Sequence, residues 1–266
     1  MKKRLIGAAI ILAIFIPVLA KGELLFALLA AVVGALASKE LLDVRFDDKK
    51  LPMPLKVLSY LAVALITLNN FTSTQMLIIL DYRILSLLLL AFLLPIVIIN
   101  NQQKYNLEDA LYLLGTSIFI GLSFSLIVLV RNYSILYLIY FLLITVMTDT
   151  FALFTGMLVG KHQLAKRISP NKTIEGFVGG TLMGVFIPTV FYVTVINPEI
   201  SLISIVLVTM VLSIVGQLGD LAFSAIKRFY GKKDFSDLIP GHGGVLDRCD
   251  SIIFVILTAI LFMSII

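Results

Sequence analysis

The sequence is poor in the residues that most often build metal clusters and cross-links. It has one Cys, two His and no Trp among 266 residues. The lone Cys249 excludes an intramolecular disulfide and a cluster of thiolate metal ligands, and the two histidines, His162 and His242, are too few to predict a zinc site. Charged residues are also scarce, at 14% of the chain against 60% hydrophobic residues. This composition excludes an ordinary soluble domain and predicts a membrane protein with several spans.

Long apolar runs follow one another along the whole chain. A membrane span takes roughly 17–25 apolar residues, and backbone hydrogen bonding in lipid leaves only helices or closed barrels. The runs are too long for barrel strands, so we expect an all-α, polytopic integral membrane protein with about nine transmembrane helices. The short gap between the first two runs favours a helical hairpin over a cleaved leader. The runs lie at about residues 5–20, 24–37, 57–68, 84–99, 110–130, 135–158, 176–196, 202–226 and 251–265.

Lys and Arg residues are distributed unevenly between the two sides that this topology defines. Of the 21 in the chain, 18 fall at the N-terminus or in loops on the same side, and only Lys21, Arg83 and Arg131 fall on the other. Because positive charge marks the cytoplasmic side, we expect the N-terminus in the cytoplasm and the C-terminus outside. The expected location is the cell inner (cytoplasmic) membrane.

Charges inside the predicted helices are also uneven. Residues 1–105 carry none deep within a span, whereas acidic residues occur inside the helices from about residue 145 onward. We therefore interpret residues 1–105 as N-terminal transmembrane scaffold helices. Residues 106–266 are interpreted as a C-terminal transmembrane catalytic region with cytoplasmic loops at 160–175 and 227–250.

Asp149, in the run TVMTDTFALFTGMLVGK, is the first of these acids. It precedes Lys161 by 12 residues, which corresponds to about 18 Å along a helix. A carboxylate this deep in a membrane is energetically costly and usually marks a functional site. A hydrogen bond from Asp149 and Thr150 to a neighbouring helix is the structural alternative.

The segment ISPNKT combines a helix start with polar side chains. Pro170 disfavours a helical conformation at Ser169, and Thr173 can cap the helix that follows. Ser169, Asn171, Lys172 and Thr173 offer hydroxyl, amide and ammonium donors at a helix N-terminus, which suits a phosphate. A solvated cap is the alternative interpretation.

Three glycines recur at every fourth residue of the helix predicted next. They are Gly176, Gly180 and Gly184. A stripe of this kind lets a second helix approach closely. We therefore expect these glycines to serve packing.

The run GQLGDLAFSAIKR, residues 216–228, places an acid, a hydroxyl and two cations on one helical face. Ser224 follows Asp220 by four residues, and Lys227 and Arg228 follow one helical turn later. A single acid–lysine pair would suit a structural role. The whole set indicates the lining of a site.

The segment KKDFSDLIPGHGGVLDRCD, residues 232–250, is the most polar part of the chain. Its PGHGG turn has backbone N–H groups that can approach an anion closely. Asp247 and Asp250 stand three residues apart at the start of the last span, where the helix dipole alone favours an acid. The dipole leaves the other polar residues of the segment unexplained. These are Lys233, His242, Gly243, Gly244 and Arg248.

Oxygen ligands without Cys or His clusters favour Mg²⁺. We expect Asp220 and Asp247, from different helices, to be its ligands. Nearby cations would bind phosphates, so the sequence predicts phosphoryl-type chemistry at the cytoplasmic membrane face without a protein nucleophile. The cations are Lys172, Lys227, Arg228, Lys233 and Arg248.

The run SAIKRFYGKKDFSDLIPGHGGVLDRCD, residues 224–250, resembles the signature of the CDP-diacylglycerol synthases, or phosphatidate cytidylyltransferases. The segments DTFALFTG and ISPNKTIEGFVGG are similar to earlier blocks of that family, so the resemblance covers roughly residues 145–251. The chain departs from the family pattern at Leu153, Met157, Asn171 and Cys249. The signature is met by Ser224, Lys227, Arg228, Lys233, Asp234, Ser236, Pro240, His242, Gly243, Gly244, Asp247, Arg248 and Asp250.

The resemblance implies a reaction in which CTP and phosphatidic acid give CDP-diacylglycerol and pyrophosphate with Mg²⁺. It also implies a second, monovalent cation such as K⁺ and a homodimer in the lipid bilayer. We do not expect nucleic acid as a partner. It implies catalytic roles for Asp220, Asp247, Lys227, Asp149 and Asp250, with Asp220 and Asp247 as metal ligands. Substrate contacts are expected from Ser169, Asn171, Lys172, Thr173, Ser224, Arg228, Lys233, His242, Gly243, Gly244 and Arg248.

Three other functions use some of the same features. A CTP-dependent kinase or cytidylyltransferase acting on a polyprenol or ether lipid would share the chemistry. An ion-coupled transporter could use Asp149 and Asp220, but it predicts inverted repeats, and the sequence has no such symmetry. A CDP-alcohol phosphotransferase would need a D-G…A-R…G…D…D run, which is absent from the sequence.

Overall fold

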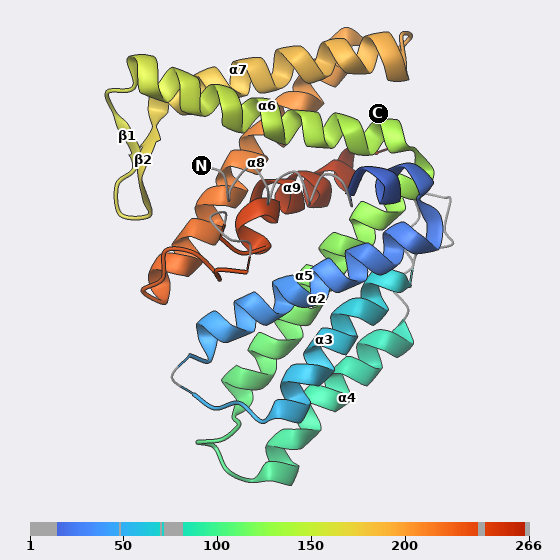
Figure 1. Cartoon of the computed structure of the whole chain (residues 1–266), viewed down its shortest axis with the longest axis vertical. Helices are drawn as coiled ribbons and strands as arrows, with labels where there is room; N and C mark the ends of the chain where they lie inside the picture. Colours follow the sequence, from blue (N-terminus) through green and yellow to red (C-terminus); the bar gives the residue numbers. More distant parts are fainter. Residues whose placement is uncertain (1–14, 48, 70, 72–81, 239–242, 264–266) are drawn as a thin grey trace. The chain divides into compact units, whose positions relative to one another are not determined.

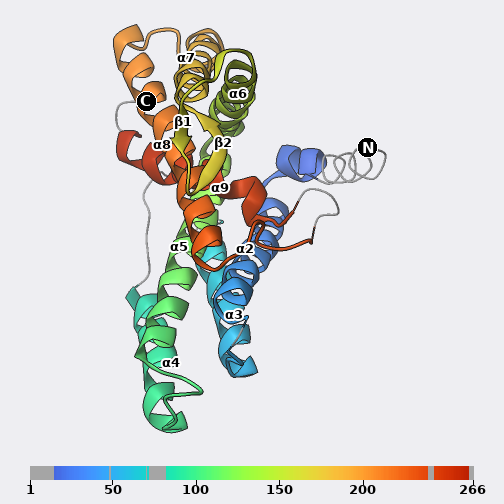
Figure 2. The same ribbon diagram turned by 90° about the vertical axis from the view of Figure 1, so that its left-hand side faces the viewer.

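The computed structural model describes residues 15–47, 49–69, 71, 82–238 and 243–263. Helices make up almost all of this described part, and its only strands are the short β1 and β2 (Figures 1 and 2). Packing divides the chain into two compact units. Unit 1 comprises Met1–Tyr133 and Asp234–Asp247, and unit 2 comprises Ser134–Lys233 and Arg248–Ile266. These units are defined by packing, so the functional division at residue 105 stays a prediction.

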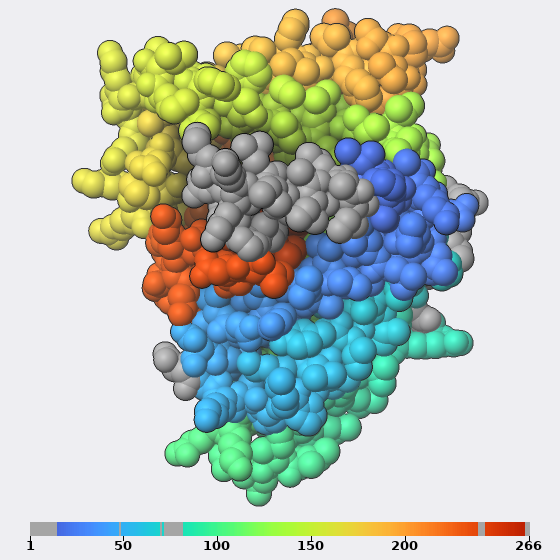
Figure 3. Space-filling model, viewed as in Figure 1, coloured from blue at the N-terminus to red at the C-terminus, as the bar shows by residue number. Residues whose placement is uncertain are grey.

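Among its described residues, unit 1 contains four main helices. They are α2 (Glu23–Arg45), α3 (Met53–Leu68), α4 (Tyr82–Ile99) and α5 (Leu107–Tyr133). Helices α2, α3 and α5 pack on one another, and α4 lies along α5 (Figure 1); α2 and α3 adjoin on the face seen in Figure 3. The apolar core between them includes Leu42, Phe46, Leu51, Leu55, Ala62, Ile66, Leu88, Phe92, Ala110 and Leu113.

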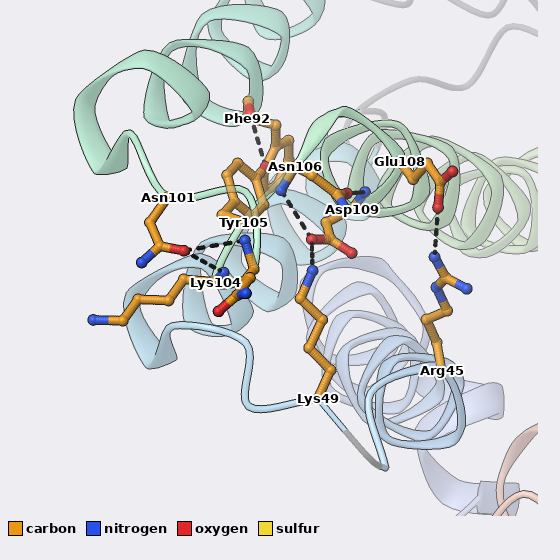
Figure 4. A network of polar contacts seen from close by, with 10 residues as sticks. Arg45, Lys49, Phe92, Asn101, Lys104, Tyr105, Asn106, Glu108 and Asp109 are labelled. Atoms are coloured by element: carbon orange, nitrogen blue, oxygen red, sulfur yellow. Dashed lines mark hydrogen bonds and ion pairs between the residues drawn. The ribbon is translucent and has the colours of Figure 1, made fainter.

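A polar network closes one end of unit 1 (Figure 4). Asn106 and Asp109 cap α5 reciprocally, each accepting a hydrogen bond from the other's backbone N–H at 2.9–3.0 Å. Lys49 forms an ion pair with the buried Asp109, and the Tyr105 hydroxyl donates to the carbonyl of Phe92 at 2.7 Å. Burial, helped by the Asp109 charge, raises the pKa of Tyr105 above its usual range. These contacts join the loops after α2 and α4 to the start of α5.

Unit 2 pairs two antiparallel helices, α6 and α7, beside a third, α8. Figure 1 shows α6 and α7 side by side, with the β1–β2 hairpin extending from one end of the pair. Buried hydroxyl groups join α6 to α8, including a 2.6 Å hydrogen bond between Tyr140 and Thr209. In chain order the elements are α6 (Ile135–Val159), β1 (Gln163–Ala165), β2 (Ser169–Thr173), α7 (Ile174–Phe191), the π-helical turn η1 (Tyr192–Ile196), α8 (Leu202–Phe229) and α9 (Leu246–Ala259), which begins in unit 1 and ends in a 3₁₀ turn.

The glycine stripe of α7 faces α6, as the sequence predicts. A Cβ atom on Gly180 would lie 2.7 Å from both the Cβ of Ala152 and the carbonyl oxygen of Thr148. Gly176 and Gly184 are similarly crowded by α6 atoms. The packing interpretation of these three glycines is therefore confirmed.

Helix length and side-chain exposure confirm an all-α, multi-pass membrane protein. Within the described residues six helices are long and apolar enough to cross a membrane, and α3 is a shorter apolar helix of 16 residues. Large apolar side chains stay exposed on them, including Ile98 at 78% and Leu158 at 81%, which suits contact with lipid. The prediction of nine spans and the sides of the two termini stay predictions, because the first apolar run falls mostly outside the described residues.

Candidate active site

An ion pair between β2 and α8 lies at the centre of the polar groups in unit 2. The ammonium of Lys172 is 2.5 Å from Oδ2 of Asp220, and the two side chains are 29% and 24% exposed. The hydroxyl of Ser224, one helical turn after Asp220, donates to Oδ1 at 3.3 Å. The pair therefore joins residues from two segments for which the sequence predicts different ligands, phosphate for Lys172 and a metal for Asp220.

The β1–β2 hairpin holds Lys172 in this position. Thr173 caps α7, because its hydroxyl accepts the N–H of Gly176 at 3.0 Å. Glu175, in the first turn of α7, accepts from His162 on the other side of the hairpin at 2.6 Å. The Nε of Arg228 in α8 donates to the carbonyl of Ile168 at 3.3 Å. The predicted cap is confirmed, and the predicted loop at 160–175 contains two short strands.

Two further carboxylates interact electrostatically with Asp220. They belong to Asp149 of α6 and Asp250 of α9, and they also interact with each other. We call Asp149, Asp220 and Asp250 the carboxylate cluster. Lys172 acts electrostatically on Asp149, and the buried Lys227 acts on Asp250. The cluster thus gathers acids from three helices of unit 2 with two cations beside them.

Polar side chains lie around Asp149 within the otherwise apolar helices of unit 2. The hydroxyl of Ser251 donates to its Oδ2 at 3.4 Å, which realises the helix-to-helix hydrogen bond considered as the structural alternative. Hydroxyl and amide groups of α6, α8 and α9 line a narrow pocket beside it. They come from Thr145, Thr148, Ser213, Gln217 and Ser251.

The two predicted metal ligands, Asp220 of the carboxylate cluster and Asp247, offer donors that suit a hard divalent cation. Its protein ligands would all be oxygen atoms, which Mg²⁺ prefers. In the described part of the chain, no three His, Cys, Asp or Glu side chains lie close enough together to hold a metal ion by themselves. Mg²⁺ usually takes one or two carboxylates and completes its shell with water and substrate phosphates, so an incomplete protein shell is suited to it.

Asp247 lies in unit 1 and organises the turn before it. Its Oδ2 accepts the N–H of Gly244 at 2.9 Å and the N–H of Phe235 at 3.0 Å. Gly243 has a φ of +83°, a conformation that favours glycine. Because Asp247 and Asp220 belong to different units, a cation shared by the two stays a prediction.

The other predicted site residues lie at varied positions. Asn171 and Lys233 are exposed, as are Arg228 and Arg248, whereas Ser169 is half-buried. Arg228 also donates from Nη1 to the carbonyl of Lys232 at 2.9 Å, which closes the C-terminal end of α8. His242 lies outside the described residues.

Sequence reasoning missed Glu40. This buried residue of α2, 4% exposed, accepts hydrogen bonds from the segment that carries Asp247. The only local signal is a charged residue that follows an apolar run, and such a residue usually lies at a solvated helix end.

Comparisons with known proteins identify the family of the chain. A family model described as the cytidylyltransferase family matches residues 2–266. Curated proteins named phosphatidate cytidylyltransferase are similar over the same length. Those of Staphylococcus saprophyticus and Staphylococcus epidermidis are 36% and 38% identical over 256 residues, and that of Staphylococcus aureus is 35% identical over 257 residues, with 96% of both chains covered in each case.

These matches extend from the first apolar run to the last and include every segment that carries the candidate site. They set aside the transporter and the CDP-alcohol phosphotransferase, and they identify a nucleotidyltransferase enzyme that uses CTP. The chain belongs to the cytidylyltransferase family.

Proposed function

We propose that the protein is a phosphatidate cytidylyltransferase of phospholipid biosynthesis. It transfers the cytidylyl group of CTP to phosphatidic acid at the cytoplasmic face of the inner membrane, with Mg²⁺ bound. An oxygen of the lipid phosphate forms a bond to the α-phosphorus of CTP, and the bond from that phosphorus to the β-phosphate oxygen breaks. The products are CDP-diacylglycerol and pyrophosphate.

The observation that carries this proposal is the Lys172–Asp220 ion pair beside Asp149 and Asp250. It combines an ammonium suited to phosphate with carboxylates suited to a divalent cation. The names of the similar proteins indicate the lipid substrate, phosphatidate, and the group that is transferred, a cytidylyl group.

The main obstacle in the proposed reaction is the repulsion between two anions. Two unit charges 4 Å apart repel by about 4 kcal/mol at an effective dielectric near 20, and CTP and phosphatidate each carry more than one charge. Mg²⁺ held by Asp220 and Asp247 would neutralise part of this charge when bound. Lys172, Lys227, Arg228, Lys233 and Arg248 would contribute the remaining positive charge toward the phosphates.

Positioning is the second contribution of the protein's own residues. The β1–β2 hairpin is fixed at Thr173, Glu175 and Ile168, so Lys172 is held in place before substrate arrives. Ser224 and Ser251 orient the carboxylates of Asp220 and Asp149. A preorganised charge of this kind favours in-line attack without a protein nucleophile. The monovalent cation and the homodimer implied by the family resemblance stay predictions.

The proposal is tested with CTP labelled at one phosphorus at a time. Purified protein in detergent receives phosphatidate, Mg²⁺ and either α-labelled or γ-labelled CTP. We expect the α-label in a lipid product and the γ-label in pyrophosphate. A polyprenol and a polyprenol phosphate, each offered in place of phosphatidate, should give no labelled lipid.

The two labels separate the alternatives. Transfer of the γ-label to lipid would identify a CTP-dependent kinase and contradict the proposal. Efficient labelling of the polyprenol phosphate would move the function to another lipid. Absence of any labelled lipid from a monodisperse, folded sample would refute the proposed reaction.

A further inference from the structure

Glu40 is a buried carboxylate held by three donors from a distant part of the sequence. Its Oε1 accepts the hydroxyl of Ser236 at 2.6 Å and the N–H of Val245 at 2.8 Å, and its Oε2 accepts the N–H of Leu246 at 2.8 Å. The donors follow Glu40 by 196–206 residues, yet all four residues belong to unit 1. A buried charge is costly unless hydrogen bonds replace its lost water, so these contacts are specific to the folded state.

The same short stretch of backbone is shared between Glu40 and Asp247. Three successive N–H groups, those of Gly244, Val245 and Leu246, are divided between them, the first to Asp247 and the next two to Glu40. Leu246 and Asp247 begin α9. The orientation of the Asp247 carboxylate therefore depends on backbone that Glu40 fixes.

Gly244 gives an independent sign that this contact is close. A Cβ atom at this position would lie 2.6 Å from each carboxylate oxygen of Glu40. Any side chain would push Glu40 away from the backbone that it binds. The close approach of Glu40 therefore explains why this residue is a glycine. This role of Gly244 is separate from the phosphate contact that the sequence predicts.

We infer that Glu40 is a positioning residue for cytidylyl transfer, holding the backbone of Val245 and Leu246 so that Asp247 presents its carboxylate to the divalent cation. The inference rests on the proposed function. It makes α2, in the region interpreted as scaffold, part of the catalytic apparatus. Residues that orient a metal ligand commonly affect metal affinity or activity by about 10- to 100-fold when they are replaced.

The test compares Glu40→Gln with a matched control on the same helix, Asp43→Asn. Both variants lose one negative charge from α2, but the Asp43 side chain is 47% exposed and forms its ion pair, at 3.3 Å, with Lys56 of α3. Two quantities are measured on the full-length protein: the Mg²⁺ concentration for half-maximal activity, and hydrogen exchange at the amides of Val245 and Leu246.

For Glu40→Gln we expect the half-maximal Mg²⁺ concentration to rise by about 10-fold. The amides of Val245 and Leu246 should also exchange about 10-fold faster or more, because a glutamine presents an N–H group toward backbone donors. Asp43→Asn should leave both quantities unchanged. Ser236→Ala, which removes one of the three donors, should give a smaller shift of the same kind and serves if Glu40→Gln does not fold.

Two results would overturn the inference. One is a folded Glu40→Gln protein with wild-type exchange at Val245 and Leu246. The other is lower thermal stability with an unchanged Mg²⁺ dependence, since this would give Glu40 a structural role alone. A wild-type protein that makes no CDP-diacylglycerol would remove the proposed function and this inference together, whereas an active wild type with an unaffected Glu40→Gln removes the inference only.

Discussion

At the scale of single residues, Asp220 is the most informative position. It meets the ammonium of Lys172 and the hydroxyl of Ser224, and it interacts electrostatically with Asp149 and Asp250. In the proposed reaction, its charge would act both on the divalent cation and on the lysine that contacts phosphate. Replacing Asp220 and replacing Lys172 should consequently have different kinetic effects.

We expect Asp220→Asn to lower kcat by about 1,000-fold, because a neutral amide loses both the charge for a divalent cation and the partner of Lys172. Initial rates of CDP-diacylglycerol formation at saturating CTP and Mg²⁺ give this value, and size-exclusion chromatography checks folding. Glu199→Gln, in the exposed loop before α8, is the control. Near-normal turnover by folded Asp220→Asn would contradict the metal assignment.

Lys172→Met should mainly raise the KM for CTP, by about 10-fold or more, since a charged hydrogen bond to phosphate is lost. Steady-state kinetics with varied CTP measure the effect. Lys166→Met changes an exposed cation in the turn of the same hairpin and should leave KM unchanged. Equal shifts from the two variants would indicate a general attraction of charge instead of a phosphate contact at Lys172.

Residue-level prediction from the sequence succeeded where the contact is local. The spacing of Asp220 and Ser224 places both on one helical face, and the hydrogen bond between them confirms it. Glu40 was missed because its partners lie about two hundred residues away in sequence. Such a contact leaves no mark on the neighbouring sequence.

At the scale of secondary-structure elements, the close packing of α6 against α7 determines the arrangement of the helices in unit 2. Gly180 lies against Ala152 and Thr148 with no room for a side chain. Pairs of this kind are stabilised by packing between backbones at short range. The geometry of Asp149 on α6 and of the hairpin that leads into α7 depends on this pairing.

Gly180→Leu should therefore damage assembly of unit 2 and not the chemistry alone. We expect a loss of about 3 kcal/mol or more in stability from overpacking, seen as a lower unfolding temperature in detergent. Val178→Leu, on the exposed side of α7 at 50% exposure, should be tolerated. A stable, correctly inserted Gly180→Leu protein with only a changed KM would contradict the packing role.

The sequence predicted helices well and their limits less well. The apolar run at 24–37 continues as helix through Arg45, because charged residues such as Lys39 and Glu40 are also good helix formers. The strands β1 and β2 have only three and five residues, and a Pro in β2 argues against a strand by local rules. Tertiary contacts to Glu175 and Arg228 stabilise the hairpin instead.

At the scale of the whole molecule, the uneven distribution of Lys and Arg predicts which loops face the cytoplasm. Ile174–Ile196 is long and apolar enough to cross a membrane. It connects the basic β1–β2 hairpin to the loop that contains Glu199. These two segments should therefore be accessible to reagents from opposite sides of the membrane.

Cysteine labelling tests this arrangement, because Cys249 is the only native cysteine. In a Cys249→Ser background, Glu199→Cys should react with an impermeant maleimide added to intact cells. Lys166→Cys should react only after the membrane is opened. The reverse pattern would invert the topology and place the proposed site on the outer face.

The return of residues 234–247 to unit 1 has a consequence for how the protein is made. During translation the early helices emerge with Glu40 already in place, but the backbone that satisfies its carboxylate is synthesised only after all of α6, α7 and α8. The first unit thus remains unfinished until residues 234–247 have been synthesised. A chain that ends before Ser236 would lack all three groups that donate to Glu40. Its Glu40 carboxylate would then be buried without hydrogen-bond donors from this segment, which is energetically costly.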